Sequence, residues 1–445
     1  MTNDTSFLPS NIELRDLAEE VGGILQSLFH AVRPMPGGVD LLPLVPSVGE
    51  GAGALPKLWH LILENATRLD SPLMSGHMDT APHPYAVLTQ TIVSALNQNM
   101  LFRELSPFAS NIEESLIELF LDRLNLGSDW GGTWASGGSI ANLTALFCAV
   151  GGYDGGVERT NVHMLLPESG HASLKKAAAI LGIPKSQISL IKCNDAGAID
   201  IDALDQSLSG KAGSAHCVVT SVLGTTIHGS VDDISGISSL CQKYGAWHHV
   251  DAIYGGALMF SKSHRKLLAG LSGANSVVVG PQKWMYVPRV SAAVLISGKD
   301  DFDRKLGVSM PYSISGETHR GFWGLQGSRP ADAVVLWTLL QALGTDVIGQ
   351  QIDASIALTQ NFYKCLLDCK TVAPAHVPDL NLQVIRPGGK LDAIEIQKNL
   401  TREGGLWTSV SQWRDQMYLR TVLLSPKLNE KHVSDFAVSL EEAAS

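Results

Sequence analysis

The stretch from Trp247 to Pro288 constrains the fold more than any other part of the chain. It contains two short apolar runs, one ending at Val250 and one at Val279. Asp251 follows the first run and Lys283 follows the second. Short apolar runs of this kind predict buried strands. Ligands of open α/β sheets bind beyond the carboxyl ends of the strands, so we expect Asp251 and Lys283 to face one site.

A lysine and a carboxylate in this arrangement suit pyridoxal 5′-phosphate (PLP). This cofactor needs a lysine that forms a Schiff base and an acid that keeps its pyridinium nitrogen protonated. The apolar neighbours Val277, Val278, Val279 and Trp284 would partly desolvate Lys283, and desolvation makes an amine more nucleophilic near neutral pH. A lysine and an aspartate at strand ends can also be purely structural, so this interpretation depends on other motifs.

Composition restricts the class of protein. A chain of 445 residues with 45% hydrophobic and 17% charged residues predicts a well-packed soluble protein of two or three lobes. The net charge of −10 and the lack of a Lys/Arg-rich block argue against nucleic acid or a membrane as partner. The six scattered cysteines form no CxxC motif, so we expect free thiols, no metal site and a cytoplasmic location. The N-terminus shows no signal-peptide pattern.

Periodic patterns predict several further elements. Apolar residues at helical spacing predict helices over residues 11–32, 57–69 and 111–125, the last with Asn111 as its N-cap. Residues 33–56 are rich in Pro and Gly and are expected to be extended. Asp232 and Asp233 are expected to begin a helix that ends near Tyr244.

Three more motifs could contact a cofactor. Gly138 and Ser139 lie in a small-residue loop that leads into an apolar helix, and the backbone N–H groups at a helix N-terminus bind anions such as phosphate. His171 directly precedes a predicted helix, and Thr225 and Thr226 follow a predicted strand. Each motif alone is also compatible with a structural role.

Together, the segments HVDAIYGG and QKWMYVP and these motifs, in this order, resemble the group II PLP-dependent amino acid decarboxylases, the family of aromatic amino acid and glutamate decarboxylases. The resemblance extends from about Ser71 to about Pro426. It implies the fold-type I (aspartate aminotransferase-like) α/β architecture with a mostly parallel sheet, and a homodimer. The domains expected are an N-terminal helical and extended segment (1–70), a large PLP-binding domain (71–344) and a small α+β domain (345–445).

The resemblance also implies roles for individual residues. For the cofactor, Lys283 would carry PLP, Asp251 would hold the pyridinium and His171 would stack on the ring. The remaining implied contacts are Gly138 and Ser139 with the phosphate, Thr225 or Thr226 near the cofactor, His77 and Met78 around the substrate side chain, and Thr80 near the substrate carboxylate.

Three positions depart from the family pattern. Ile253 replaces an alanine that packs on the PLP face, Gly280 replaces an asparagine that contacts the phosphate, and Gln282 replaces a histidine near the reacting carbon. Glutamine cannot donate a proton as imidazole can. The resemblance therefore assigns reprotonation of the substrate α-carbon to Tyr312, in a Gly/Ser-rich segment expected to be a mobile lid that reaches the other subunit's site.

The expected function is PLP-dependent α-decarboxylation of an amino acid to an amine and carbon dioxide. One alternative is another PLP reaction on the same scaffold, either decarboxylation coupled to oxidative deamination, which yields an aldehyde, or β-elimination. The other alternative is a paralogue that binds a partner without catalysis. The presence of Lys283, Asp251 and His171 argues against this last possibility.

Overall fold

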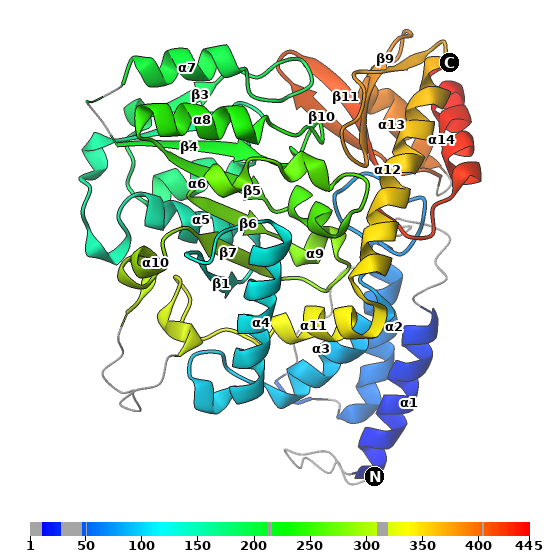
Figure 1. Cartoon of the computed structure of the whole chain (residues 1–445). Coiled ribbons are helices and arrows are strands. Elements are labelled where there is room, and N and C mark those ends of the chain that lie inside the picture. Colours follow the sequence, from blue (N-terminus) through cyan, green and yellow to red (C-terminus); the bar gives the residue numbers. More distant parts are fainter. Residues whose placement is uncertain are drawn as a thin grey trace.

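The computed structural model describes residues 11–27, 47–49, 51–211, 213, 216–308, 319–402 and 405–445. These residues form a large domain around a seven-stranded sheet, a small domain with a four-stranded sheet, and helices from the N-terminal part of the chain (Figure 1). The predicted α/β fold class is confirmed. The predicted domain boundaries stay predictions.

The seven-stranded sheet has the order β1-β7-β6-β5-β4-β2-β3. The five strands from β6 to β3 run parallel to one another, whereas β7 is antiparallel to both of its neighbours. The strands are β1 (Gly131–Ala135), β2 (Val162–Pro167), β3 (Ile188–Ile191), β4 (His216–Val222), β5 (Trp247–Ala252), β6 (Ser276–Val279) and β7 (Ala292–Ile296). The sheet is therefore mostly parallel, as predicted.

Strand β6 shows why its apolar run is continuous. Val277, Val278 and Val279 are fully buried, because helices cover both faces of the sheet. Val277 and Val279 pack in the cluster that includes α4 and α8, whereas Val278 packs in the cluster that includes α5 and α10. Successive side chains of a strand point to opposite faces, so a strand covered on both sides is apolar throughout.

The helices of the large domain divide between these two faces. The first face is covered by α5 (Gly138–Ala149), α6 (Ala172–Ile180) and α10 (Lys299–Leu306), and the second by α4 (Pro107–Arg123), α7 (Ile201–Ser209), α8 (Ile234–Tyr244) and α11 (Ala333–Leu343). Helix α8 begins as predicted, since the Asp233 side chain accepts a hydrogen bond from the Gly236 N–H at 3.0 Å. Asp232 is instead buried and accepts the N–H groups of Ile199 and Val222.

The small domain follows helix α12 (Thr345–Leu367). Its antiparallel sheet has the order β10-β11-β9-β8. The four strands are β8 (Val372–Pro374), β9 (Leu382–Pro387), β10 (Ser409–Trp413) and β11 (Gln416–Val422), and the helices that follow α12 are α13 (Ala393–Thr401) and α14 (Glu430–Ala443). Helices α12, α13 and α14 share one core with this sheet.

The N-terminal helices are α1 (Asn11–Ser27), α2 (Leu55–Asn65) and α3 (Pro84–Leu96). Residues 28–32 of the first predicted helix, and most of the predicted extended segment, lie outside the described residues. Helix α2 begins at Leu55 and ends at Asn65, whereas the predicted range was 57–69; a proline in its first turn favours a helix start there.

Three details of the prediction were wrong. Helix α4 begins at Pro107 rather than Asn111, again with proline in its first turn, and Asn111 instead accepts a hydrogen bond from Arg103. Strand β1 was missed because it starts with two glycines, which are depleted in strands. Helix α10 was missed because its residues KDDFDRKL are mostly charged, and it occupies part of the segment expected to be a lid.

Among the described residues, no single helix is both long enough and apolar enough to cross a membrane. Helices α11 and α12 meet those criteria only together, across a 90° bend. The described residues also contain no group of three or more His, Cys, Asp or Glu side chains that could hold a metal ion. All six cysteines are free thiols, and the cytoplasmic location stays a prediction.

A buried cluster of three charges ties α4 to the segment that follows residue 318. Glu113 accepts hydrogen bonds from both terminal nitrogens of Arg329 at 2.7 Å and from Arg320 Nε at 3.0 Å, and from the backbone N–H of Trp134 at 3.1 Å. Burial alone raises the pKa of Glu113, but the charges of Arg329 and Arg320 outweigh burial and lower the pKa to about 2. The cluster holds Arg320 and Arg329 beside strand β1.

Replacing Glu113 with glutamine is expected to lower the free energy of unfolding by about 3–5 kcal/mol, because two guanidinium groups lose their buried counter-ion. Chemical denaturation measures this loss. The neighbouring Glu114→Gln is the control, since Glu114 forms a partly exposed pair with Arg103 and pairs open to solvent contribute at most about 1 kcal/mol. Because the pKa of Glu113 is lowered from 4.5 to about 2, its contribution is complete above pH 4.5 and is lost as the pH falls toward 2. Equal losses in both variants at neutral pH would contradict the assignment.

Candidate active site

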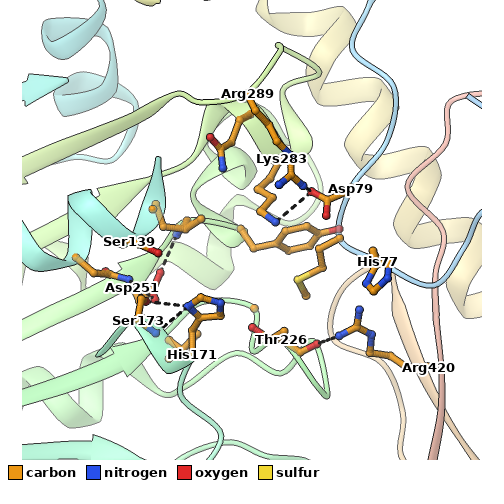
Figure 2. Close-up of a pocket in the computed structure, with 18 residues that line it drawn as sticks. His77, Asp79, Ser139, His171, Ser173, Thr226, Asp251, Lys283, Arg289 and Arg420 are labelled. Carbon is orange, nitrogen blue, oxygen red and sulfur yellow. Dashed lines mark hydrogen bonds and ion pairs between the residues drawn. The ribbon is translucent and has the colours of Figure 1, made fainter. Parts of the chain in front are cut away.

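The carboxyl ends of β5 and β6 meet at one edge of the large sheet and bring Asp251 and Lys283 to a common cavity. Asp251 belongs to β5 and pairs in register with Val278 of β6, and Lys283 lies on the short helix α9 (Pro281–Trp284) directly after β6. The cavity has a volume of about 330 Å³ (Figure 2). It is lined by His77, Met78, Asp79, Gly138, Ser139, Asn142, His171, Ser173, Val222, Gly224, Thr226, Asp251, Ile253, Tyr254, Gln282, Lys283, Arg289 and Arg420.

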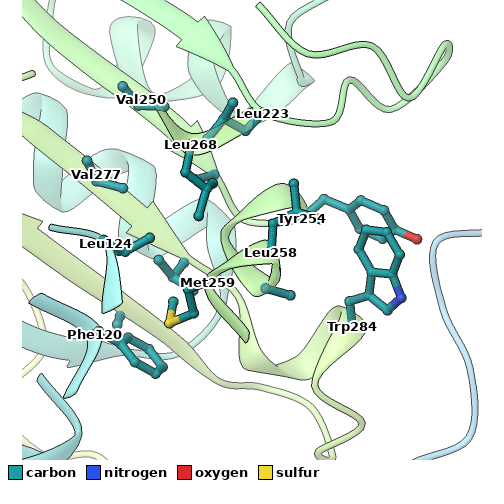
Figure 3. Packing of buried hydrophobic residues seen from close by; sticks show 14 of the residues in the cluster. Phe120, Leu124, Leu223, Val250, Tyr254, Leu258, Met259, Leu268, Val277 and Trp284 are labelled. Atoms are coloured by element: carbon teal, nitrogen blue, oxygen red, sulfur yellow. The ribbon is translucent and has the colours of Figure 1, made fainter. Parts of the chain in front are cut away.

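Lys283 points into this cavity from a rigid base. The adjacent Trp284 is fully buried and stacks on Tyr254, with ring centroids 4.9 Å apart and planes at 23° (Figure 3). Lys283 Nζ lies 3.2 Å from Asp79 Oδ1, and Asp79 also contacts Arg289. Burial lowers the pKa of Lys283, the charge of Arg420 lowers it further, and Asp251 partly opposes the shift. A lysine with a lowered pKa is a better nucleophile at neutral pH.

Asp251 is buried at the inner end of the cavity. Its Oδ2 accepts a hydrogen bond from Asn142 Nδ2 at 2.9 Å, and its Oδ1 accepts one from the Ile253 N–H at 3.2 Å. Burial raises the pKa of Asp251 above its ordinary value, and these two hydrogen bonds and the nearby His171 and Lys283 oppose only part of that rise. A carboxylate oxygen can accept more than one hydrogen bond, so Asp251 keeps acceptor capacity for a cationic ring N–H in the cavity.

His171 forms the N-cap of α6 and lines the cavity. Its Nδ1 lies 2.8 Å from Ser173 Oγ and 3.2 Å from the Ser173 backbone nitrogen. These two contacts anchor one edge of the imidazole to the helix start and leave its other atoms toward the cavity. His171 thus lines the same cavity as Asp251, and its stacking on a cofactor ring stays a prediction.

The N-terminus of α5 also faces the cavity. Gly137 has a φ of 85°, which glycine tolerates best, and Gly138 and Ser139 begin the helix and line the cavity. The free N–H groups of such a helix start attract phosphate. Thr226 lines the cavity as well, but Thr225 does not. The Thr225 side chain is fully buried and lies 2.7 Å from Ser230 Oγ, so of the two expected threonines Thr226 is the one that lines the cavity.

Two of the departures from the family pattern fit each other. A Cβ added at Gly280 would lie 2.6 Å from the Ile253 carbonyl oxygen and 2.8 Å from an Ile253 methyl carbon, so no larger residue fits at position 280.

Gln282 lines the cavity, and its Oε1 accepts a hydrogen bond from the Ser291 N–H at 2.7 Å. Its NH2 group is then the part available to the cavity, as a hydrogen-bond donor.

The segment from residue 77 to residue 80 is only partly as predicted. His77 and Met78 line the cavity, and burial, followed by Arg420, lowers the pKa of His77. Thr80 does not line it. The chain turns away after Asp79, where the Ala81 N–H donates to the Leu69 carbonyl, and Thr80 lines a separate cavity beside Tyr286 and Ile348. The expectation that Thr80 faces the substrate carboxylate was therefore wrong.

Sequence reasoning missed Arg420, which strand β11 brings to the cavity from the small domain (Figure 2). Arg420 is 6% exposed and donates to the carbonyl oxygens of Thr226 and Gly76, each at 2.7 Å. Burial lowers its pKa to about 10. Within the described part of the chain, its Nε has no hydrogen-bond partner and no carboxylate forms an ion pair with it. An arginine within the apolar run YLRTVLL was the available signal.

Asp79 and Asn142 were missed as well, and the position of Tyr312 is not tested. Asp79 carried no motif signal, and Asn142 is one polar residue in an apolar helix. Tyr312 lies in 309–318, outside the described residues, so its role stays a prediction.

The donor set of this cavity fits PLP. A desolvated lysine, a buried carboxylate and a glycine-led helix start are the groups that the aldehyde, the pyridinium and the phosphate of PLP require. A Cβ added at Gly138 would lie 3.0 Å from the Ile253 side chain, so glycine is the residue that fits best at this helix start.

Comparison with known proteins agrees with the cavity. Residues 58–373 match the pyridoxal-dependent decarboxylase conserved domain. The chain belongs to this family. It is 28% identical over 396 residues to an L-2,4-diaminobutyrate decarboxylase of Rhizobium meliloti (strain 1021), which covers 85% of this chain and 78% of that protein. It is 24% identical over 418 residues to the acidic amino acid decarboxylase GADL1 of Homo sapiens, covering 86% and 80% of the two chains.

Solved structures show the same fold. Mouse CSAD has a TM-score of 0.90 at 20% identity and covers 98% of this chain and 99% of its own. Oryza sativa TDC with PLP and tryptamine has a TM-score of 0.88 at 18% identity and covers 99% of both chains. These structures confirm the predicted fold, and the match to the family domain confirms the predicted family and PLP as cofactor. The protein is a PLP-dependent amino acid decarboxylase.

Proposed function

We propose that this decarboxylase removes the α-carboxylate of an amino acid and releases the amine. The observation that carries the proposal is the convergence of Lys283, Asp251, His171 and the α5 N-terminus on one cavity. PLP, when bound, supplies the electron sink for the carbanion that decarboxylation leaves. The side chains of the protein bind and orient the cofactor and the substrate, and they supply the proton.

Each group has a role that follows from its environment. Lys283 carries the cofactor, because its lowered pKa makes its amine available as a nucleophile. Asp251 accepts the pyridinium N–H, and the N–H groups of Gly138 and Ser139 hold the phosphate. His171 lies against one face of the ring, where an aromatic contact is favourable.

Arg420 supports the binding of a carboxylate from the substrate. A buried guanidinium without a counter-ion is costly, and a carboxylate ligand offsets that cost with charge-assisted hydrogen bonds. Asp79, which contacts Arg289 and Lys283, places a negative charge in the same cavity. The cavity therefore suits a zwitterionic substrate with polar substituents better than an apolar one.

A panel of purified amino acids tests the reaction. Carbon dioxide, amine, aldehyde, ammonia and peroxide are measured together under air, with acidic, diamino and aromatic substrates in parallel. We expect carbon dioxide and amine in equal amounts from at least one substrate. Carbon dioxide without amine, accompanied by aldehyde and oxygen uptake, would overturn the proposed product.

The oxidative alternative has one observation in its favour. Gln282 stands where the family has histidine, and an amide cannot supply a proton. We propose that Tyr312 supplies the proton to the α-carbon instead. Its hydroxyl is a suitable donor, because a tyrosine with its reference pKa of about 10 is protonated at neutral pH. Tyr312→Phe should therefore lose amine and divert some turnover to aldehyde, ammonia and peroxide.

We also propose that the active unit is a homodimer. Tyr85, Leu88, Ile92 and Leu96 lie on one face of α3 and are 50–63% exposed. Exposed apolar groups in a row along one helix mark an interaction surface. A second copy of the chain is the occupant that this proposal assigns to the surface. Action of Tyr312 across a subunit interface requires such an assembly.

Mixing inactive variants tests action across the dimer. Lys283→Ala and Tyr312→Phe chains are each expected to form little amine alone. If Tyr312 acts across the interface, one of the two sites in a mixed dimer regains both residues, so an equal mixture should recover about a quarter of the wild-type sites. Two affinity tags, one on each chain, establish that subunits exchange. Proven exchange without recovered amine would contradict action across the interface.

A further inference from the structure

A continuous set of hydrogen bonds, buried in its centre and partly buried at its ends, lies behind the cavity and reaches Asp251 and His171, which Figure 2 labels. It joins β5, β6, α5 and α6. The network begins with Trp247 Nε1 and Ser276 Oγ (3.0 Å) and continues from Ser276 Oγ to His249 Nδ1 (2.9 Å). His249 Nε2 then contacts Asn142 Oδ1 (3.0 Å). From Asn142 Nδ2 one branch leads to Asp251 Oδ2 (2.9 Å), and the other leads to Ser173 Oγ (3.0 Å) and on to His171 Nδ1 (2.8 Å). Asn142 is the branch point.

The beginning of this network has a defined direction. The Trp247 indole can only donate, so Ser276 Oγ accepts from it. His249 is fully buried, and burial lowers its pKa to about 3, so its ring is neutral with one donor nitrogen and one acceptor nitrogen. Two arrangements remain. Either Ser276 donates to His249 Nδ1 and His249 Nε2–H donates to Asn142, or His249 Nδ1–H donates to Ser276 and the Asn142 amide is reversed.

The charge of Asp251 decides between these arrangements. A reversed Asn142 amide would place its carbonyl oxygen 2.9 Å from Asp251 Oδ2, and two acceptors at that distance repel unless the carboxyl is protonated. An ionised Asp251 therefore requires the Asn142 NH2 group to face it. His249 Nε2–H must then donate to the Asn142 carbonyl oxygen.

The other branch sets the proton of His171. The second N–H of Asn142 donates to Ser173 Oγ at 3.0 Å. The Ser173 hydroxyl proton is then free to donate to His171 Nδ1, which also accepts from the Ser173 N–H. With Nδ1 accepting, the neutral imidazole carries its proton on Nε2, toward the cavity.

We propose that Asn142 is a positioning residue that couples Asp251 to His171. Its amide holds the Asp251 carboxylate ionised and oriented and, through Ser173, keeps His171 in the Nε2–H form. His249 acts through Asn142 by selecting the orientation of the amide. The proposal rests on Asp251 and His171 as cofactor-facing residues, and it assigns a function to two buried residues that do not touch the reacting atoms themselves.

Histidine tautomers in the PLP-loaded protein, where the pyridinium favours an ionised Asp251, give the first test. Nitrogen-15 NMR of labelled histidine distinguishes Nε2–H from Nδ1–H rings, and His171→Gln and His249→Gln assign the two signals. We expect both rings as Nε2–H in the natural protein. Asn142→Leu should increase the share of His171 that is protonated at Nδ1, because only the Ser173 N–H then favours a proton-free Nδ1. A His171 ring protonated at Nδ1 in the natural protein would overturn the proposal.

Cofactor affinity gives the second test and needs no substrate. Asn142→Asp keeps the acceptor for His249 but cannot donate, and Asn142→Leu removes both functions without adding charge. Each should weaken PLP binding by about 10- to 100-fold, the range expected when a charged group loses a hydrogen bond. Asn399→Leu, on α13 in the small domain, is the control and should bind PLP like the natural protein.

The His249 variants separate positioning from simple packing. Glutamine at position 249 can offer an amide N–H to Asn142, whereas leucine cannot. His249→Gln should retain PLP affinity and His249→Leu should lose about tenfold. Equal behaviour of these two variants, or natural affinity in a folded Asn142→Leu protein, would overturn the proposal. Because both tests omit substrate, their outcome is independent of whether any amino acid is decarboxylated.

Discussion

Replacing Lys283 with alanine is expected to reduce turnover by at least about a thousandfold, the scale on which enzymes lose activity when a covalent nucleophile is removed. Lys283 is the lysine of the cavity, and burial lowers its pKa. Lys283→Arg should be equally inactive. It keeps a positive charge opposite Asp79, but a guanidinium stays protonated and cannot act as the nucleophile.

Borohydride reduction and peptide mapping locate the lysine directly. The pyridoxyl group should be found on the peptide that contains Lys283 and should be absent from both variants. Lys266→Ala is a matched control on the same chain segment, since Lys266 is exposed and does not line the cavity. A label on any other lysine, or full turnover by Lys283→Ala, would remove the central assignment.

Asp251→Asn should lower turnover by about 10²- to 5,000-fold while PLP still binds at saturating cofactor. The substitution leaves a cationic ring nitrogen without its buried counter-ion, which costs about 3–5 kcal/mol, and 1.36 kcal/mol corresponds to a tenfold change in rate. PLP remains bound because Lys283 and the α5 N-terminus are unchanged. Loading is measured from the cofactor absorbance, and turnover from carbon dioxide release.

The control for this change is Asp233→Asn, the same substitution at the N-cap of α8. Asparagine caps helices about as well as aspartate, so the fold and the turnover should be retained. Loss of PLP together with loss of fold in Asp251→Asn would indicate a structural carboxylate. Near-normal turnover by Asp251→Asn would show that the pyridinium has another partner.

Much of the site could be predicted from local patterns. The apolar runs that end at Val250 and Val279 form β5 and β6, and parallel pairing places Asp251 and Lys283 at the same sheet edge. Gly138 and Ser139 begin a helix because small residues precede a run of apolar residues at helical spacing. These features depend on residues close in sequence, so one chain suffices to predict them.

Other predictions failed at positions where the direction of a side chain depends on how the backbone turns. Thr225 and Thr226 are adjacent, yet only Thr226 lines the cavity, because the chain turns at Gly224, whose φ is 91°. Thr80 follows Asp79 but faces a different cavity. No periodicity extends through such turns, and therefore no pattern indicated which side chain would face the cofactor.

By itself, the sequence determined most of the elements, their order and the two residues at the ends of β5 and β6, since strand patterns and helix starts are set by neighbouring residues. Only the tertiary structure decided which residues from distant parts of the chain lie beside Asp251 and Lys283. Arg420 reaches the cavity because β11 of the small domain lies against the large domain, and Asn142 meets His249 and Asp251 because α5 packs on β5. Those contacts depend on how distant elements pack, and packing is a property of the whole core rather than of any segment.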